Sequence, residues 1–93
     1  MVARKMTLEE IQNERFATQD VLPKFKEKFE RHQKLISAMA LTNAQHEPVY
    51  LLVMLANGEV VEVYSDLIDY EDDYVEVHGG FGIPLIAICD VGV

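Results

Sequence analysis

The sequence predicts an α+β protein in which two helices precede five short strands. The apolar spacing follows a helical period up to about residue 43 and changes to a period of two after Pro48. The charge changes at the same place: residues 1–46 hold all eight lysines and arginines and six acids, whereas residues 47–93 hold ten acids and neither cation. We therefore expect a helical extension over 1–46 and an acidic β domain over 47–93.

The helical part begins with a capping box, because Thr7 and Glu10 have the spacing at which each side chain binds the other residue's backbone N–H. A first helix is expected from there to about Thr18. Asp20 is expected to cap a second helix that ends near Asn43. Apolar residues in this helix step by four and three, at Phe25, Phe29, His32, Ile36 and Met39. The spacing predicts that this stripe packs on something.

The β part contains a strong hairpin signal at Asn57-Gly58, which predicts a type I′ turn between two long strands. The expected strands cover residues 49–56, 60–64, 74–78, 83–88 and 89–93, and an acidic connection covers residues 66–73. Pro84 is expected at a strand start or a sheet edge, since it has no backbone donor.

Length and composition restrict the class of protein. The chain has 93 residues, enough for one core, and its apolar content of 49% predicts a homo-oligomer that covers the remaining apolar surface. The longest apolar run, Val49–Ala56, is too short to span a membrane, and no signal region follows Met1. We expect a cytoplasmic protein without membrane contact. Cys89 is the single cysteine and cannot form an internal disulfide.

The β part resembles the Sm-like superfamily, which includes Sm, LSm and bacterial Hfq proteins. The resemblance covers about Val49–Val93. It rests on Leu55-Ala56-Asn57-Gly58, Val60–Tyr64, Ile68-Asp69, Tyr74–Val77 and a second motif over Ile83–Val91. It implies N-terminal helices followed by a small, strongly bent five-stranded antiparallel barrel. It also implies a ring of about five to seven subunits, in which strand edges of neighbouring copies pair.

The resemblance suggests where RNA and neighbouring subunits would bind. The family's polar RNA contact corresponds to Asp72 or Asp73, and its basic contact corresponds to Leu85-Ile86 or Cys89-Asp90, where no cation remains. Any RNA pocket is therefore acidic and degenerate, and binding to RNA is expected to be weak. The candidate RNA-binding residues are Asp72, Asp73, Tyr74, His78, Lys24 and Lys28. The candidate structural turn residues are Asn57, Gly58 and Asp69, and the candidate oligomer interface contains Ile83, Leu85, Ile86, Ile88 and Val91.

Other candidate sites have plainer interpretations. The acids over 66–73 could hold a hard cation, but they lack the spacing of a dedicated loop and fit a solvated turn better. His32 and His78 fit a half-buried helix position and a loop position. Cys89 has no basic neighbour in sequence, so it is not expected to be a nucleophile. The sequence predicts no catalytic, metal or cofactor site.

Two functions remain after these exclusions. The first is a ring-forming Sm-like protein that acts as an RNA-associated scaffold. The alternative is an acidic protein-interaction module that binds the basic surface of a partner and does not bind RNA. An enzyme is not expected, because the sequence contains no nucleophile with a base, no phosphate loop and no metal-ligand set.

Overall fold

Ten elements follow one another in a computed structural model that describes residues 3–45 and 47–92. They are β1 (Arg4–Lys5), α1 (Leu8–Ile11), α2 (Phe25–Gln45), β2 (Val49–Met54), β3 (Val60–Ser65), β4 (Leu67–Tyr70), β5 (Tyr74–Val77), β6 (Phe81–Pro84), the 3-10 helix η1 (Leu85–Ala87) and β7 (Ile88–Gly92). Four residues lie outside the described ranges: Met1, Val2, His46 and Val93. They include both ends of the chain, the boundary expected at residue 46 and the end of the last expected strand.

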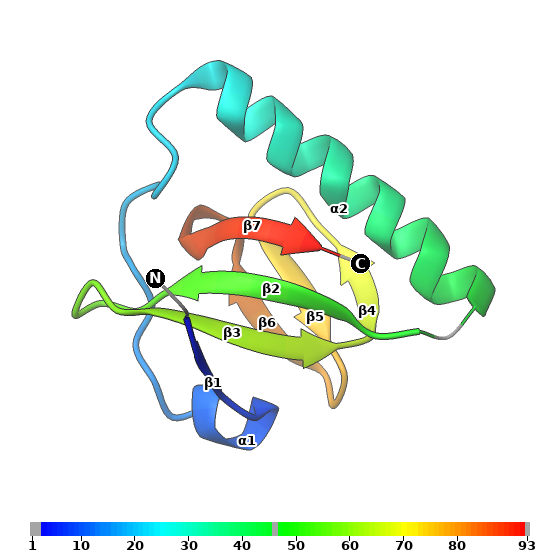
Figure 1. Ribbon diagram of the computed structural model, residues 1–93, viewed down its shortest axis with the longest axis horizontal. Helices are drawn as coiled ribbons and strands as arrows, with labels where there is room; N and C mark the ends of the chain where they lie inside the picture. Colours follow the sequence, from blue (N-terminus) through cyan, green and yellow to red (C-terminus); the bar gives the residue numbers. More distant parts are fainter. Residues whose placement is uncertain (1–2, 46, 93) are drawn as a thin grey trace.

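The strands form two sheets, and residues 3–45 and 47–92 contain no closed barrel. One sheet has the order β1-β3-β2-β7 and the other has the order β4-β5-β6. β1 runs parallel to β3, while all other neighbouring strands are antiparallel. The predicted five-stranded antiparallel barrel is therefore wrong. The strands do not close into a barrel, because the chain leaves the four-stranded sheet after Ser65 and returns to it through η1. As a result, β6 and β7 belong to different sheets (Figure 1).

The hairpin predicted at Asn57-Gly58 is confirmed, although its turn differs from the expected one. β2 and β3 pair from Val49 opposite Ser65 to Met54 opposite Val60. Leu55 N donates to Glu59 O at 2.8 Å, and Gly58 N donates to Leu55 O at 2.9 Å. These bonds enclose a three-residue loop in which Gly58 has φ +89°, which is the arrangement of a turn followed by a glycine bulge.

The other β predictions were right in part. The third expected strand is confirmed as β5. The acidic connection expected over 66–73 contains strand β4, which the acid content of the segment concealed. Residues 83–88 do not form one strand, because the chain turns into η1 directly after Pro84. Pro84 ends β6, which is an edge strand of its sheet, so the expected edge position is confirmed and the strand start is wrong.

The helices were predicted in the right region but with wrong bounds. The capping box of Thr7 and Glu10 is present, with both bonds at 3.1 Å, but α1 ends at Ile11 and does not reach Thr18. Helix α2 begins at Phe25, and Asp20 does not cap it. Asp20 instead accepts hydrogen bonds from Leu22 N and from the Arg31 guanidinium.

Helix α2 lies against β4 and β7, and its buried side is not the predicted one (Figure 1). The buried residues of α2 are Arg31, Leu35, Ala38 and Thr42. Of the predicted stripe, only Met39 packs against the core, while Phe25, Phe29 and Ile36 are exposed. Most of the stripe therefore does not pack on the core of its own chain, and the side of the helix that carries Arg31 and Leu35 faces inward.

One core joins both halves of the chain. The largest buried side chains come mainly from the strands, but Met6, Ile11, Leu35 and Ala38 of the N-terminal half belong to the same cluster. The segment before α2 also reaches the sheets through its backbone. Ala17 N donates to Met54 O at 3.1 Å, and Val21 N donates to Ile86 O at 2.9 Å. The N-terminal half is therefore built into the same packed unit as the β part.

Candidate functional site

The turn between β4 and β5 concentrates acidic side chains at one end of the three-stranded sheet. Asp69 lies on β4, and Glu71, Asp72 and Asp73 follow before β5 begins. We call residues 69–73 the acidic turn. Its backbone is fixed at two points, because Glu71 N donates to Tyr74 O and Leu85 N donates to Asp73 O, both at 3.0 Å. The four carboxylates are exposed on a backbone that β5 and η1 hold in place.

The charge of the acidic turn is not balanced within the described ranges. Ion pairs there join Arg4 to Glu59, Arg31 to Asp20 and Lys34 to Asp90, and none of them includes a residue of the turn. The hydrogen bond and the charge of Asp69 raise the pKa of Glu71, and the charges of the other two acids add to this. A raised pKa means that the ionised carboxylates repel one another. A cation that approached the turn would relieve this repulsion.

Two exposed apolar side chains lie next to the acidic turn. Ile68 precedes it on β4 and is 49% exposed, and Tyr74 follows it on β5 and is 38% exposed. The Tyr74 ring lies over Gly82 of β6, where an added Cβ would come within 3.1 Å of the ring. Burial, and then the charges of Glu71 and Asp69, raise the pKa of the Tyr74 hydroxyl. The turn thus combines negative charge with an apolar border.

Helix α2 reaches this region through one polar contact. His32 Nδ1 lies 2.8 Å from Tyr70 Oη, and the two rings are tilted with centroids 5.6 Å apart. Partial burial is the main cause that raises the pKa of the Tyr70 hydroxyl. The contact joins the middle of α2 to the last residue of β4. It was not predicted, because the two residues are 38 positions apart in the sequence.

The candidate RNA-binding residues do not form one site. Asp72, Asp73 and Tyr74 lie at the start of β5, whereas His78 follows its end, roughly 13 Å away at about 3.3 Å per strand residue. His78 N donates to Ser65 Oγ at 3.1 Å, and the residue borders a hollow beside α1. Lys24 and Lys28 lie at the start of α2 and are exposed.

The residues expected at an oligomer interface are divided between core and surface. Ile83, Ile88 and Val91 are buried in the core of the same chain. Leu85 and Ile86 are half-buried in η1, and the Ile86 carbonyl already accepts a hydrogen bond from Val21. β6 and β7 are each the last strand of their sheet, so each has one edge without a strand neighbour among the described elements.

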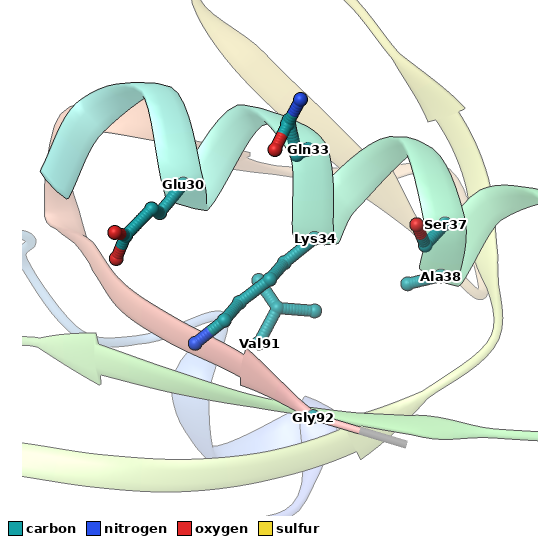
Figure 2. Close-up of a pocket in the computed structure, with 7 residues that line it drawn as sticks. All are labelled: Glu30, Gln33, Lys34, Ser37, Ala38, Val91 and Gly92. Carbon is teal, nitrogen blue, oxygen red and sulfur yellow. The ribbon is translucent and has the colours of Figure 1, made fainter. Parts of the chain in front are cut away.

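A groove of about 420 Å³ runs between α2 and the end of β7, on the side away from β4. Figure 2 shows Lys34 extending from α2 past Val91, with Glu30, Gln33 and Ser37 along the same helix. Lys34 Nζ is bound to Asp90 Oδ1 at 2.7 Å, and this bond raises the pKa of the lysine. The cation of the groove is therefore already neutralised.

A larger hollow of about 690 Å³ lies over β2 and β3, and the Arg4–Glu59 ion pair borders it.

Cys89 is half-buried on β7. Burial raises the pKa of the Cys89 thiol, which disfavours the reactive thiolate. Within residues 3–45 and 47–92, no cluster of three or more histidine, cysteine or acidic side chains has a geometry that could hold a metal ion. No helix in the same ranges is both long and apolar enough to cross a membrane.

The chain matches no protein-family model, and no curated protein or solved structure matches it. The resemblance to the Sm-like superfamily therefore stays a prediction from the motifs. The structure also leaves Phe25, Phe29 and Ile36 of α2 exposed.

Proposed function

We propose that the protein is an acidic interaction module that binds a basic and partly apolar surface of another protein. The observation that carries this proposal is the acidic turn with its two apolar neighbours, Ile68 and Tyr74. The backbone of the acidic turn is held by hydrogen bonds. Its carboxylates are exposed and have no cationic partner within residues 3–45 and 47–92. A surface of this kind favours a partner that supplies both cations and an apolar contact.

Two physical consequences follow from this assignment. Binding a cation beside Glu71 favours its ionised form, so binding lowers the raised pKa of Glu71 and releases protons near the midpoint of its titration. The affinity therefore falls at low pH. It also falls as salt is added, because the attraction acts between exposed groups.

Nucleic acid fits this surface less well than a basic protein does. The net charge of −8 and the ten acids after residue 46 repel phosphates. The candidate RNA-binding residues Tyr74 and His78 are separated by the length of β5, Lys24 directly precedes α2, and Lys28 lies in the first turn of α2. We expect poly-uridine to bind more weakly than a basic peptide at every salt concentration.

The test is a fluorescence anisotropy titration with a labelled peptide that alternates lysine or arginine with leucine. One variant neutralises the turn with Asp69→Asn, Glu71→Gln, Asp72→Asn and Asp73→Asn. A control variant has the same net charge through Glu9→Gln, Glu14→Gln, Glu30→Gln and Glu47→Gln, all at exposed positions. We expect the turn variant to lose about tenfold or more in affinity and the control to lose much less.

Three outcomes would contradict the proposal. Equal losses in the two variants would show that the net charge alone attracts the peptide. An unchanged affinity in the turn variant would place binding elsewhere. Tighter binding of poly-uridine than of the peptide at physiological salt would favour the RNA-associated scaffold.

A further inference from the structure

One side of α2 carries three exposed apolar residues over about three turns, with the exposed His32 between Phe29 and Ile36. Phe25 is 83% exposed, Phe29 is 48% exposed and Ile36 is 52% exposed. The two phenylalanine rings stack on each other at 6.4 Å with an interplanar angle of 15°, so each covers little of the other's outer face. We call these three residues the phenylalanine flank.

The geometry of the helix explains why the phenylalanine flank is exposed. Successive residues are rotated by about 100°, so Phe29 and Ile36 lie roughly 140–160° from Arg31 around the helix axis. Arg31 belongs to the buried side, which faces β4 and β7. Phe25, Phe29 and Ile36 therefore face away from the buried side, although His32, which lies between Phe29 and Ile36 on the helix surface, contacts Tyr70 of β4. Helix α2 lies on the outside of the molecule (Figure 1).

The charges along α2 are arranged against its own dipole. Lys24, Lys26 and Lys28 crowd the N-terminal end, which is the positive end of a helix dipole, and Glu27 is the acid of the first turn. The last turn, at the negative end, contains no basic residue. None of the three lysines forms an ion pair with any residue in the described ranges. In an antiparallel pair, the lysine-rich N-terminal end of each helix would lie beside the C-terminal end of the other helix. That end has the negative pole of the dipole and no basic residue in its last turn.

We infer that the phenylalanine flank is a self-association surface, on which α2 of a second copy of this chain packs in the antiparallel direction. A two-fold axis between Phe29 and Ile36 places each Phe29 against the other copy's Ile36. The same register places Phe25 opposite Ala40, whose small, exposed side chain leaves room for the ring. It also brings Lys24 within one turn of the other helix's C-terminal end, where a cation is stabilised.

The available area predicts a reversible dimer. An aromatic side chain has on the order of 150–250 Å² to bury, so the flank offers roughly 300–400 Å² of apolar surface per copy. A stable complex buries about 800 Å² per partner, so the flank provides about half of a standard interface. Dissociation in the micromolar range is the expected result. This inference does not depend on the acidic turn, and the two surfaces can be tested separately.

The first experiment is sedimentation velocity across low to high micromolar concentrations of the full chain. The wild type should shift from monomer to dimer, and Phe25→Asp with Phe29→Asp should raise the dissociation constant by about tenfold or more. The matched control is Tyr64→Asp, because Tyr64 is 51% exposed but lies on β3. Thermal melts followed by circular dichroism verify that each variant is folded.

The second experiment tests the register. Phe25→Ala should weaken the dimer, and adding Ala40→Phe to the same chain should restore it, because each position 25 faces the other copy's position 40. A monomer at all concentrations, or a dimer that the aspartate pair leaves unchanged, would overturn the self-association surface. Failure of Ala40→Phe to restore the dimer would overturn the antiparallel register.

Discussion

At the scale of single residues, Gly58 shows how one backbone position determines a hairpin. Its φ of +89° lies in the left-handed region, and nothing lies within 4 Å of where its Cβ would be. An added Cβ would therefore meet nothing beyond its two chain neighbours, so the cost of a side chain comes mainly from the backbone conformation. This separation of causes makes Gly58 a clean position for a stability test.

We expect Gly58→Val to lower the free energy of unfolding by about 1–3 kcal/mol, because a β-branched residue is strained at positive φ. Gly58→Asn is the matched variant and should lose less, since asparagine tolerates the left-handed region better than other residues with a side chain. Urea unfolding of the three proteins measures both effects. Equal losses for valine and asparagine would contradict a backbone cause.

At the scale of elements, Arg31 determines which side of α2 is buried. Its side chain is 4% exposed and forms two bonds of 2.9 Å to the Asp20 carboxylate. A third bond of 3.1 Å runs to the Ile88 carbonyl of β7. The Nε of Arg31 has no hydrogen-bond partner among the described residues, so the buried guanidinium depends mainly on Asp20 for its charge balance and hydrogen bonds. This charge cluster fixes α2 to β7 and to the loop before the helix.

Asp20→Asn should therefore destabilise the protein by about 3–5 kcal/mol, because the variant leaves the Arg31 charge buried without a counter-ion. The hydrogen bond from Arg31 is the largest cause that lowers the pKa of Asp20 below 3.8 in the folded state. The pair thus contributes its full stability above about pH 4 and loses it as the pH falls through the folded pKa.

Thermal unfolding from pH 7 down to pH 2 tests this prediction. The wild type should lose stability over the acid part of the range, and Asp20→Asn should lack that part of the loss. Glu59→Gln is the control, because it breaks the exposed Arg4–Glu59 pair and should change stability much less. Parallel profiles of stability against pH in the wild type and in Asp20→Asn would show that the Arg31–Asp20 pair does not cause the loss of stability at acid pH.

At the scale of the whole molecule, both halves of the chain build one core. Met6, Ile11, Leu35 and Ala38 pack among the strand residues, and β1 adds a parallel strand beside β3. A chain that contained only the β part would expose the apolar surface that these residues cover. Small domains of this size have little stability to lose.

We expect a fragment of residues 47–93 to lack cooperative unfolding, whereas the full chain unfolds in a single transition. Heteronuclear NMR and thermal melts compare the two. Adding a separate peptide of residues 1–46 should restore dispersed resonances if the missing core residues are the cause. A fragment that is folded by itself would show that the predicted boundary near residue 46 separates two independent units.

Local patterns in the sequence determined the features that depend on neighbouring residues. The capping box at Thr7 and Glu10, the hairpin at Asn57-Gly58 and the strand beginning at Tyr74 were all predicted and are present. Each of them follows from backbone chemistry within a few positions, through a side chain that caps a helix, a glycine at positive φ or an alternation of apolar residues.

Only the tertiary structure decided which surfaces these elements bury. Periodicity identified the apolar side of α2 correctly, but the buried side contains Arg31, which binds Asp20 and a carbonyl 57 positions away. The division into two sheets likewise depends on where the chain crosses between them, at Asp66 and η1. Burial is decided by contacts between distant segments, and a helix presents the same periodic pattern whether its apolar side meets its own core or another molecule.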